Sequence, residues 1–396
     1  MATISQSPTD PGFVQNPYPR YAALRREGPL HDWTEYGMPA AFSYELVNAL
    51  LRDRRFGRQC PPELVPEIPE HLAPFYEVEA HSMLELDGDV HKRLRGLVLR
   101  AFTSRRIAGL APEIEAVAHK LIDAIPADAP FDLIHSYAAQ LPVIIITRLL
   151  GIPEAMAPQL LDWSNTMVAM YQARRDRQIE DAAAQATADF ADYIRSYADE
   201  RRQSPADDLI SELLAAEEAG EKLSMAELIT TCILLLNAGH EATVHTLGNG
   251  VLALLRHGDP AHWLTPERVE GTVEEILRYD PPLHFFVRYA HEEAEIAGRT
   301  FKRGDPVACL LGSANHDPEG WEHPDRFDPS RPVKTNLSFG SGAHFCIGAP
   351  LARLELRIAL PILFQRCPNL ALAEAPRYAN LYHFHGLEKL MLRTGK

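Results

Sequence analysis

The stretch Ser338–Ala349 reads SFGSGAHFCIGA and stands immediately before a run with helical periodicity. Gly340 and Gly342 allow the backbone to turn tightly and to approach a large, flat group closely. Cys346 lies just before the expected helix Ala349–Cys367, where backbone N–H groups and the helix dipole favour a thiolate. The stretch therefore predicts a loop that presents a reactive or metal-binding cysteine.

Two aromatic residues flank this cysteine within the loop. Phe339 and Phe345 can exclude water from the Cys346 sulfur. A thiolate held in a dry pocket lined by N–H groups suits a soft metal centre. For an isolated cysteine, a buried structural role in a turn is the common alternative, so the local pattern leaves both interpretations open.

The same stretch resembles the haem-binding loop of the cytochrome P450 family, Phe-Gly-x-Gly-x-His-x-Cys-x-Gly-Ala, and Leu351–Glu355 matches the family as well. The resemblance continues in the expected order over nearly the whole chain. It implies a single haem domain over residues 1–396, mainly α-helical with small β-sheets and triangular in outline. It also implies haem b as the cofactor, Cys346 as the axial ligand of the iron, and Phe339 and Gly348 beside it.

Four basic side chains match positions that hold the haem propionates in this family. Arg and His supply charge-assisted donors to buried carboxylates. His91 and Arg95 are spaced i,i+4, which places them on one helix face. A solvated basic face is the alternative for these two. The resemblance implies that the propionates are bound by His91, Arg95, Arg288 and His344.

Glu275 and Arg278 resemble the family's Glu-x-x-Arg motif. The i,i+3 spacing brings the two side chains within ion-pair reach on one helix face. In the family this pair is buried and meets an arginine from a downstream loop, a position that Arg326 fits. The implied role is structural: the three residues hold the core behind the haem.

A long central helix is predicted between two clear end signals. Ser224 and Glu227 form a plausible capping box at its start. The helix is expected to run to about Arg256 and to stop at Gly258–Pro260. At 1.5 Å per residue its length of roughly 45–50 Å is enough to cross a domain.

The middle of this helix breaks the apolar pattern at Asn237–Thr243. Such breaks inside a strong element are expected at functional sites, although a polar surface face is the alternative. The segment resembles the family's oxygen-activation stretch, with Gly239 as the small residue over the haem and Glu241 as the acid. Ala242 occupies the place where the family usually has threonine. Thr243 follows one place later, about 100° further round the helix.

The missing threonine has three explanations, because in the family that residue passes protons for O–O cleavage. Substrate hydroxyls or an ordered water can replace it, as in macrolide-type members. Alternatively, Thr243 turns inward at a local helix distortion, or electrons couple poorly to product. The presence of Glu241 argues against a nitric-oxide-reductase type, which dispenses with the acid.

The remaining secondary-structure pattern surrounds these motifs. Residues 112–256 are expected to be mostly helical, and Thr265–Tyr279 is a further helix. Phe285–Ala314 is expected to form hairpins of a small sheet. Substrate-pocket candidates are Asn237, Ala238, Leu283, Phe285, Phe286 and Phe384, of which the three phenylalanines would make the pocket apolar. The sequence does not identify the substrate beyond a small hydrophobic organic molecule.

Composition limits the partners and the compartment. The chain has 396 residues and a formal net charge of −15, which disfavours nucleic acid as a partner. Its five cysteines are scattered, as in a reduced cytoplasmic protein. The first residues show no signal-peptide pattern, and no apolar run reaches the roughly 18 residues of a membrane span. We therefore expect a cytoplasmic protein without a membrane anchor.

A basic run interrupts this acidic chain between Val90 and Pro112. It holds no acidic residue and six basic ones, which are Lys92, Arg93, Arg95, Arg100, Arg105 and Arg106. With Arg353 and Arg357 it is expected near the Cys346 face. Since electron carriers are often acidic, this patch is a predicted docking site for a ferredoxin or flavodoxin-type donor.

The resemblance implies a haem-thiolate monooxygenase that takes O2 and inserts one oxygen atom into its substrate by hydroxylation or epoxidation. A thiolate ligand favours O–O cleavage by donating electron density to the iron. Two alternatives stay open: a peroxide-driven or rearranging haem-thiolate enzyme, and a non-catalytic haem or ligand-binding protein.

Overall fold

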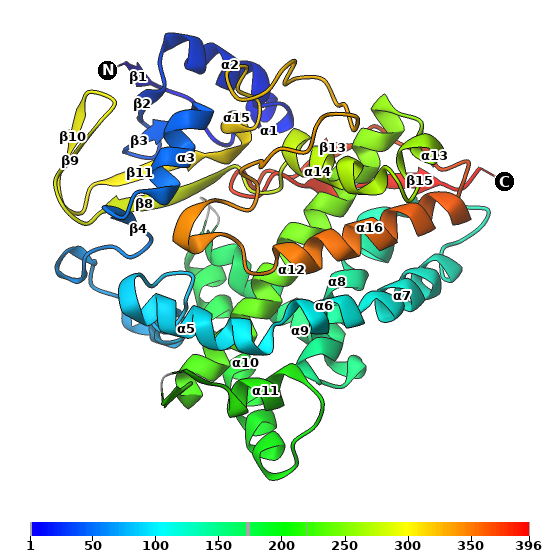
Figure 1. Cartoon of the computed structure of the whole chain (residues 1–396), viewed down its shortest axis with the longest axis horizontal. Helices are drawn as coiled ribbons and strands as arrows, with labels where there is room; N and C mark the ends of the chain where they lie inside the picture. The colour runs from blue at the N-terminus through cyan, green and yellow to red at the C-terminus, as the bar shows by residue number, and fades with distance from the viewer. Residues whose placement is uncertain (1, 172–174, 219, 396) are drawn as a thin grey trace.

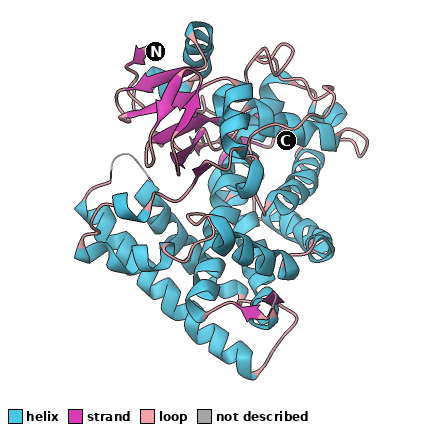
Figure 2. Cartoon of the chain, turned by 60° about the vertical axis from the view of Figure 1, so that its left-hand side comes forward, coloured by secondary structure: helices cyan, strands magenta, loops and turns pink. Residues whose placement is uncertain are grey.

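The computed structural model describes residues 2–171, 175–218 and 220–395, and its outline in Figure 1 is roughly triangular. The chain is mainly α-helical with small sheets, as predicted. The largest group of strands lies at one corner, and helices make up most of the rest (Figure 2). The described helices are α1 Pro11–Gln15, α2 Tyr18–Glu27, α3 Tyr44–Arg52, α4 Ala73–Glu79, α5 Gly88–Ala101, α6 Ser104–Gly109, α7 Ala111–Asp123, α8 Gln140–Leu150, α9 Ala157–Val168, α10 Arg177–Gln203, α11 Leu209–Ala215, α12 Met225–His257, α13 Pro260–Trp263, α14 Val269–Tyr279, α15 Leu311–Ala314 and α16 Ala349–Arg366.

The largest sheet has the strand order β1-β2-β3-β11-β8-β4. Its strands are β1 Thr3–Ile4, β2 Leu30–Trp33, β3 Met38–Ala41, β4 Phe56–Gly57, β8 Phe285–Ala290 and β11 Pro306–Leu310. The pair β8 and β11 is antiparallel, with Ala308 opposite Val287. This pair and the short hairpin of β9 Ala294–Ile296 with β10 Arg299–Phe301 confirm the hairpins predicted after residue 285.

The smaller sheets lie elsewhere along the chain. One joins β5 Phe131–Asp132, β12 Ala371–Leu372 and β15 Met391–Arg393. Another pairs β13 Arg377–Tyr378 with β14 Leu387–Lys389, and the last pairs β6 Glu217–Glu218 with β7 Glu221–Lys222. The β13–β14 pair flanks the C-terminal loop that carries Phe384.

Helix α12 runs through the interior of the domain (Figure 1). Its 33 residues begin at the predicted capping box, in which Ser224 and Glu227 exchange hydrogen bonds, and end before Gly258. Most of its side chains are buried against α8, α9, α10, α14 and α16. A helix enclosed in this way can present a few mid-helix residues to an interior site.

The basic segment after residue 90 forms two helices. Helix α5 ends at Ala101, and Thr103 starts α6 by accepting a hydrogen bond from the backbone N–H of Arg106. The competing Thr103 cap explains the break, because threonine favours helix starts over helix interiors.

Among the described residues, no helix combines the length and the apolar character that a membrane crossing requires.

Candidate functional site

The loop before α16 is held in a conformation that only glycine adopts easily. Gly340 and Gly342 have φ values of 69° and 75°, in the left-handed region. A Cβ atom on Gly342 would lie 2.4 Å from the carbonyl oxygen of Leu51 in α3. The backbone N–H of Cys346 donates to the carbonyl of Phe339 at 3.0 Å. Close packing on α3 and this hydrogen bond together fix the cysteine in place.

The sulfur of Cys346 faces the amino end of α16. Burial raises the pKa of its thiol, while backbone N–H groups of Gly348 and Ala349 and the nearby Arg95 oppose that rise. The donors thus favour a thiolate, and a coordinating thiol is deprotonated outright by its metal. The rings of Phe339 and Phe345 lie edge to face, 6.4 Å apart. The loop therefore has the donors and the apolar cover that the sequence predicted.

Two guanidinium groups near this loop lack a carboxylate partner. Arg288, on β8, is 2% exposed and donates only to the carbonyl of Val287, at 3.0 Å. Burial lowers its pKa to about 10. Arg95, on α5, donates to the carbonyl of Phe345 at 2.7 Å. No described carboxylate lies within ion-pair distance of either side chain. One buried and one half-buried cation without a carboxylate partner fit a cofactor that carries carboxylates.

The two histidines of the predicted propionate set lie together. The rings of His91 and His344 are 4.2 Å apart. Burial and the adjacent His344 lower the pKa of His91 to about 4. The Nε2 atom of His344 is 2.8 Å from Asp87, a residue that the sequence analysis did not single out. Burial opposes ionisation of Asp87, but hydrogen bonds from His344 and Gln59 outweigh it and lower its pKa to about 2.

The predicted buried ion pair is present. Arg278 donates to both carboxylate oxygens of Glu275, at 2.7 and 2.8 Å, and the two residues are 1% and 3% exposed. The third member is Arg331, whose Nε lies 3.3 Å from Glu275. The prediction of Arg326 for this place was wrong: its side chain is exposed, and only its carbonyl contacts the cluster, accepting from Arg278 and Arg331.

Glu241 is held by a neighbour one turn along α12. Nε2 of His245 lies 3.1 Å from Glu241 Oε1, and Nδ1 of His240 lies 3.7 Å from Oε2. Burial opposes ionisation of Glu241, but the hydrogen bond and charge of His245 outweigh it and lower the pKa of the carboxyl. A Cβ atom on Gly386 would lie 1.8 Å from Nδ1 of His245. Gly386 thus makes the room that His245 needs.

The hydroxyl groups near Ala242 are turned along the helix. Thr243 is buried and donates to the carbonyl of Gly239 at 3.2 Å, and Thr246 donates to the carbonyl of Ala242 at 2.7 Å. The missing Cβ of Gly239 faces Ile146 of α8 at 3.1 Å. The helix is continuous here, so the local distortion that would turn Thr243 inward is absent from this described segment.

A cavity lies beside Glu241 and under the C-terminal loop. Of the predicted substrate-pocket residues, Phe285 and Phe384 line it. Its other lining residues are Pro8, Thr9, Tyr36, Val168, Tyr171, Asn380, Leu381, Tyr382 and His383. The sequence pattern did not reveal the contribution of residues 8, 9 and 36, because it arises from tertiary packing. The cavity is aromatic, with Glu241 and His383 as polar groups.

Phe286 does not belong with Phe285. Successive side chains of β8 point to opposite faces, and Phe286 lies 5.9 Å from the guanidinium carbons of both Arg58 and Arg288. It also faces Gly340, whose Cβ would lie 3.5 Å from it. The prediction of Phe286 as a substrate-pocket residue is therefore corrected to the cofactor side of the strand.

The remaining pocket candidates have separate surroundings. Asn237 donates to the sulfur of Met167 at 3.8 Å, and its carbonyl oxygen has no partner. Ala238 is exposed on α12, and Leu283 forms a bridge with Phe384. Asn237 and Ala238 lie on α12 with the cavity residue Glu241, and Leu283 lies just before β8.

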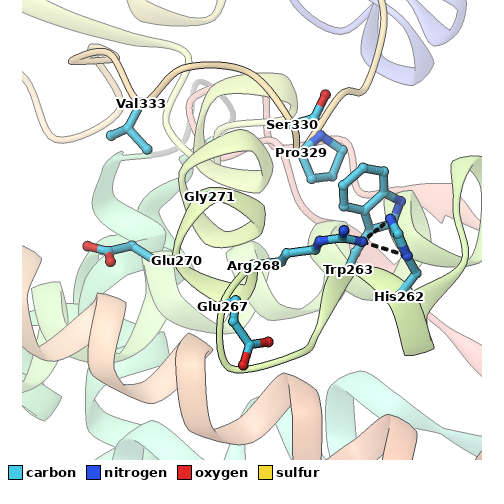
Figure 3. A pocket seen from close by; sticks show the side chains of 9 residues that line it. All are labelled: His262, Trp263, Glu267, Arg268, Glu270, Gly271, Pro329, Ser330 and Val333. Carbon is cyan, nitrogen blue, oxygen red and sulfur yellow. Dashed lines mark hydrogen bonds between the residues drawn. The ribbon is translucent and has the colours of Figure 1, made fainter.

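A second hollow lies on the surface between α13, α14 and an irregular loop, which is the loop that carries Pro329, Ser330 and Val333 (Figure 3). Arg268 lies over the ring of Trp263 at 5.8 Å and contacts His262. The hollow contains none of the predicted site residues. It is lined by His262, Trp263, Glu267, Arg268, Glu270, Gly271, Pro329, Ser330 and Val333.

The cysteine loop and the unpaired guanidinium groups fit a haem held by a thiolate, and comparisons with known proteins agree. The family model for cytochrome P450 matches residues 70–267 and 267–372. The polyketide biosynthesis cytochrome P450 PksS of Bacillus subtilis is 37% identical over 398 residues, covering 97% of each chain. The biotin biosynthesis cytochrome P450 of the same organism is 36% identical over 397 residues, covering 98% of each.

A solved structure of P450BioI, in complex with an acyl carrier protein ligated to hexadec-9Z-enoic acid, has a TM-score of 0.90. It is 35% identical, and the match covers 96% of this chain and 99% of that one. This chain belongs to the cytochrome P450 family. It is an oxidoreductase, and its cofactor is haem b.

Proposed function

We propose that the protein is a haem-thiolate monooxygenase that inserts one oxygen atom from O2 into a small hydrophobic organic substrate, by hydroxylation or epoxidation. The observation that carries this proposal is the Cys346 sulfur at the amino end of α16, within a fixed loop of the family's pattern. The aromatic cavity beside Glu241 supports the substrate class. The chain is proposed to act as one haem domain, in the cytoplasm, where cysteine thiols stay reduced.

Cys346 is proposed to hold the iron, and Arg95, Arg288, His91 and His344 are proposed to bind the two propionates. The unpaired guanidinium groups supply the charge that the propionates need. Thiolate-ligated haem supplies the reduction of O2 and the transfer of one oxygen atom to the substrate. The protein orients the substrate, excludes water with Phe339 and Phe345, and supplies protons.

Proton supply is assigned to Glu241, with His245 as its positioning residue. The pair is joined at 3.1 Å, and Ala242 offers no hydroxyl. The hydroxyl of Thr243 is committed to the carbonyl of Gly239, so a substrate hydroxyl or an ordered water is the remaining bridge. The other titratable groups lining the cavity are His383 and the phenols of Tyr36, Tyr171 and Tyr382.

The His245→Asn variant is expected to lower the yield of product per NADPH about tenfold. This loss is smaller than the roughly hundredfold loss expected when a group that transfers the proton itself is removed. Because the hydrogen bond from His245 lowers the pKa of Glu241, its loss raises that pKa. The acid limb of the coupling profile therefore moves to higher pH. His257→Asn, at the far end of α12, is the control. An unchanged acid limb in His245→Asn would contradict the role of His245.

Reconstitution with a surrogate [2Fe–2S] ferredoxin, its reductase, NADPH and ¹⁸O2 tests the function. The substrate is a hydrophobic compound whose binding perturbs the haem spectrum. Its product is expected to carry one ¹⁸O atom. Product formed with hydrogen peroxide alone, and none with the reductase system, would favour the peroxide-driven alternative. Haem and ligand binding without turnover under either condition would favour a binding protein.

The electron donor is proposed to be a ferredoxin or flavodoxin-type protein that docks near α5, α6 and α16. Arg95 and Arg353 tie this surface to the cysteine loop, since Arg353 lies 4.6 Å over the ring of Phe339. The patch is less basic than its sequence suggests. Arg93 pairs with Glu221 and Glu227, Arg106 with Asp207 and Glu212, and Arg353 with Glu274. Lys92 and Arg105 are exposed.

The rate of reduction by the acidic ferredoxin is expected to fall steeply as salt rises, because charge complementarity sets the encounter rate. Lys92→Glu and Arg105→Glu are each expected to slow reduction by about threefold to tenfold at low salt. Lys302→Glu, at an exposed position directly after β10, is the control. Reduction that is independent of salt and unchanged by both variants would place the donor elsewhere.

A further inference from the structure

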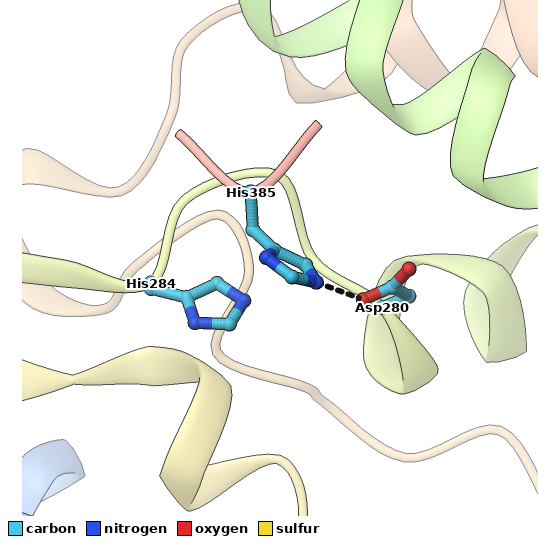
Figure 4. A group of neighbouring side chains, drawn as sticks. All are labelled: Asp280, His284 and His385. Carbon is cyan, nitrogen blue, oxygen red and sulfur yellow. Dashed lines mark ion pairs between the residues drawn. The ribbon is translucent and has the colours of Figure 1, made fainter. Parts of the chain in front are cut away.

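A buried cluster of two histidines and an aspartate lies outside the proposed haem site. Asp280 follows α14, His284 precedes β8, and His385 belongs to the C-terminal loop (Figure 4). Their exposed fractions are 6%, 0% and 4%. One ligand atom from each residue lies within 4.8 Å of the others, and Nε2 of His385 is 3.4 Å from Oδ1 of Asp280. Two segments far apart in sequence, one with Asp280 and His284 and one with His385, thus bring metal-binding groups together.

The two imidazole rings each have a buried nitrogen without a hydrogen-bond partner. These atoms are Nε2 of His284 and Nε2 of His385. The rings are 4.4 Å apart and tilted by 40°. Leaving a buried polar atom unpaired is unfavourable, so two such atoms facing one carboxylate call for a shared partner. Burial lowers the pKa of both imidazoles, which keeps their lone pairs available.

An outer layer of hydrogen bonds holds two of these side chains, His284 and Asp280. Nδ1 of His284 contacts the hydroxyl of Tyr21 at 2.8 Å. The hydroxyl groups of Tyr18 and Tyr378 donate to the two oxygens of Asp280, at 2.6 and 2.5 Å. Metal-binding histidines usually have their second nitrogen bonded in this way, because the bond sets the tautomer and the ring orientation. The cluster therefore has both the inner and the outer contacts of a metal site.

We propose that Asp280, His284 and His385 form a structural site for a divalent metal ion, best suited to Zn²⁺. Nitrogen and carboxylate oxygen are zinc ligands, with bond lengths of about 2.0–2.2 Å. Tetrahedral ligands at those lengths are roughly 3.4 Å apart, which the pair of His385 and Asp280 already matches. A shift of His284 toward the other two closes the set, and a water supplies the fourth ligand.

The site would tie the cavity wall to the rest of the domain. His385 directly follows Phe384, which lines the cavity with His383. Backbone hydrogen bonds already join this loop to the segment of His284, from His284 to His383 and from His385 to Pro282. A bound metal would add a cross-link between the C-terminal loop, α14 and the strand that carries Phe285.

The test measures zinc and iron in the haem-loaded protein after exposure to a small excess of ZnCl2 and removal of free metal by gel filtration. The expected wild-type result is about one zinc per chain, with a melting temperature that zinc raises. His385→Gln and His284→Gln are expected to retain at least about tenfold less zinc, since each removes a ligand. His383→Gln, a change on the same loop outside the cluster, is expected to retain zinc.

The iron content of each variant reports whether its haem domain has folded. If His385→Gln fails to bind haem, Asp280→Asn supplies the comparison with little change in side-chain size. Wild-type protein without zinc above the buffer level would overturn the proposal. Equal zinc in wild type and in the folded ligand variants would overturn it as well, because the metal would then lie elsewhere. Neither readout depends on turnover.

Discussion

The Cys346→Ser variant is expected to lose the far red-shifted Soret band of the reduced carbon monoxide complex and to lose turnover. Serine has nearly the same size, so the loop conformation set by Gly340 and Gly342 is retained. Its hydroxyl is a poor ligand for iron and donates little electron density. Removing an outer partner of a metal ligand already lowers metal affinity or activity by about 10- to 100-fold. Removing the ligand itself is therefore expected to lower turnover by more than about a hundredfold.

The absorption spectrum of the reduced protein with carbon monoxide is the decisive measurement. Cys60→Ser is the matched control, because Cys60 is unpaired, half-buried and outside the loop. That variant is expected to keep the wild-type spectrum and activity. A red-shifted band that survives in Cys346→Ser would mean that another cysteine ligates the iron. A band typical of histidine ligation in the wild type would remove the basis of the proposed function.

The Glu275→Ala variant is expected to lose about 3–5 kcal/mol of unfolding free energy, because it leaves a buried charge unpaired. Glu275 accepts from Arg278, from Arg331 and from the backbone N–H of Asp328. Arg278 in turn donates to the carbonyls of Asn315 and Pro324. Removing the carboxylate therefore loosens the helix α14 and the irregular loop together.

Urea unfolding and the ratio of haem to protein measure this effect. We expect Glu275→Ala to incorporate little haem, whereas Glu270→Ala, on the exposed face of α14, behaves as wild type. The two arginines of the loop, Arg331 beside Glu275 and the exposed Arg326, give a second comparison. Arg331→Ala is expected to destabilise the protein, and Arg326→Ala to change its stability by no more than about 0.5 kcal/mol. If Arg326→Ala were instead the more destabilising of the two, Arg326 would be the third member of the cluster, as the sequence predicted.

Local signals explain why much of the fold could be predicted. The capping box at Ser224 and the stop at Gly258 defined α12 to within a residue of its observed end at His257. The cysteine loop was recognisable because its glycines, its aromatic residues and Cys346 are contiguous in sequence. Glu275 and Arg278 were equally accessible, since their pairing follows from the helical repeat alone.

Contacts between distant segments could not be predicted in the same way. Arg326 and Arg331 stand in one irregular loop, and only its tertiary path decides which side chain reaches Glu275. The pairing of His344 with Asp87 joins residues 257 positions apart. The pair of Glu241 and His245 has helical spacing and could have been noticed, but the need for glycine at 386 is visible only in three dimensions.

The alternation along β8 separates two kinds of evolutionary constraint within one strand. Substitution of Phe285 alters the wall of the cavity, while substitution of Phe286 alters the packing beside Arg288 and Gly340. Substrate specificity can therefore change during evolution by substitution at residue 285, while residue 286 stays constant and maintains cofactor binding. For a designer, libraries randomised at residue 285 with residue 286 held constant would sample specificity at little risk to haem loading.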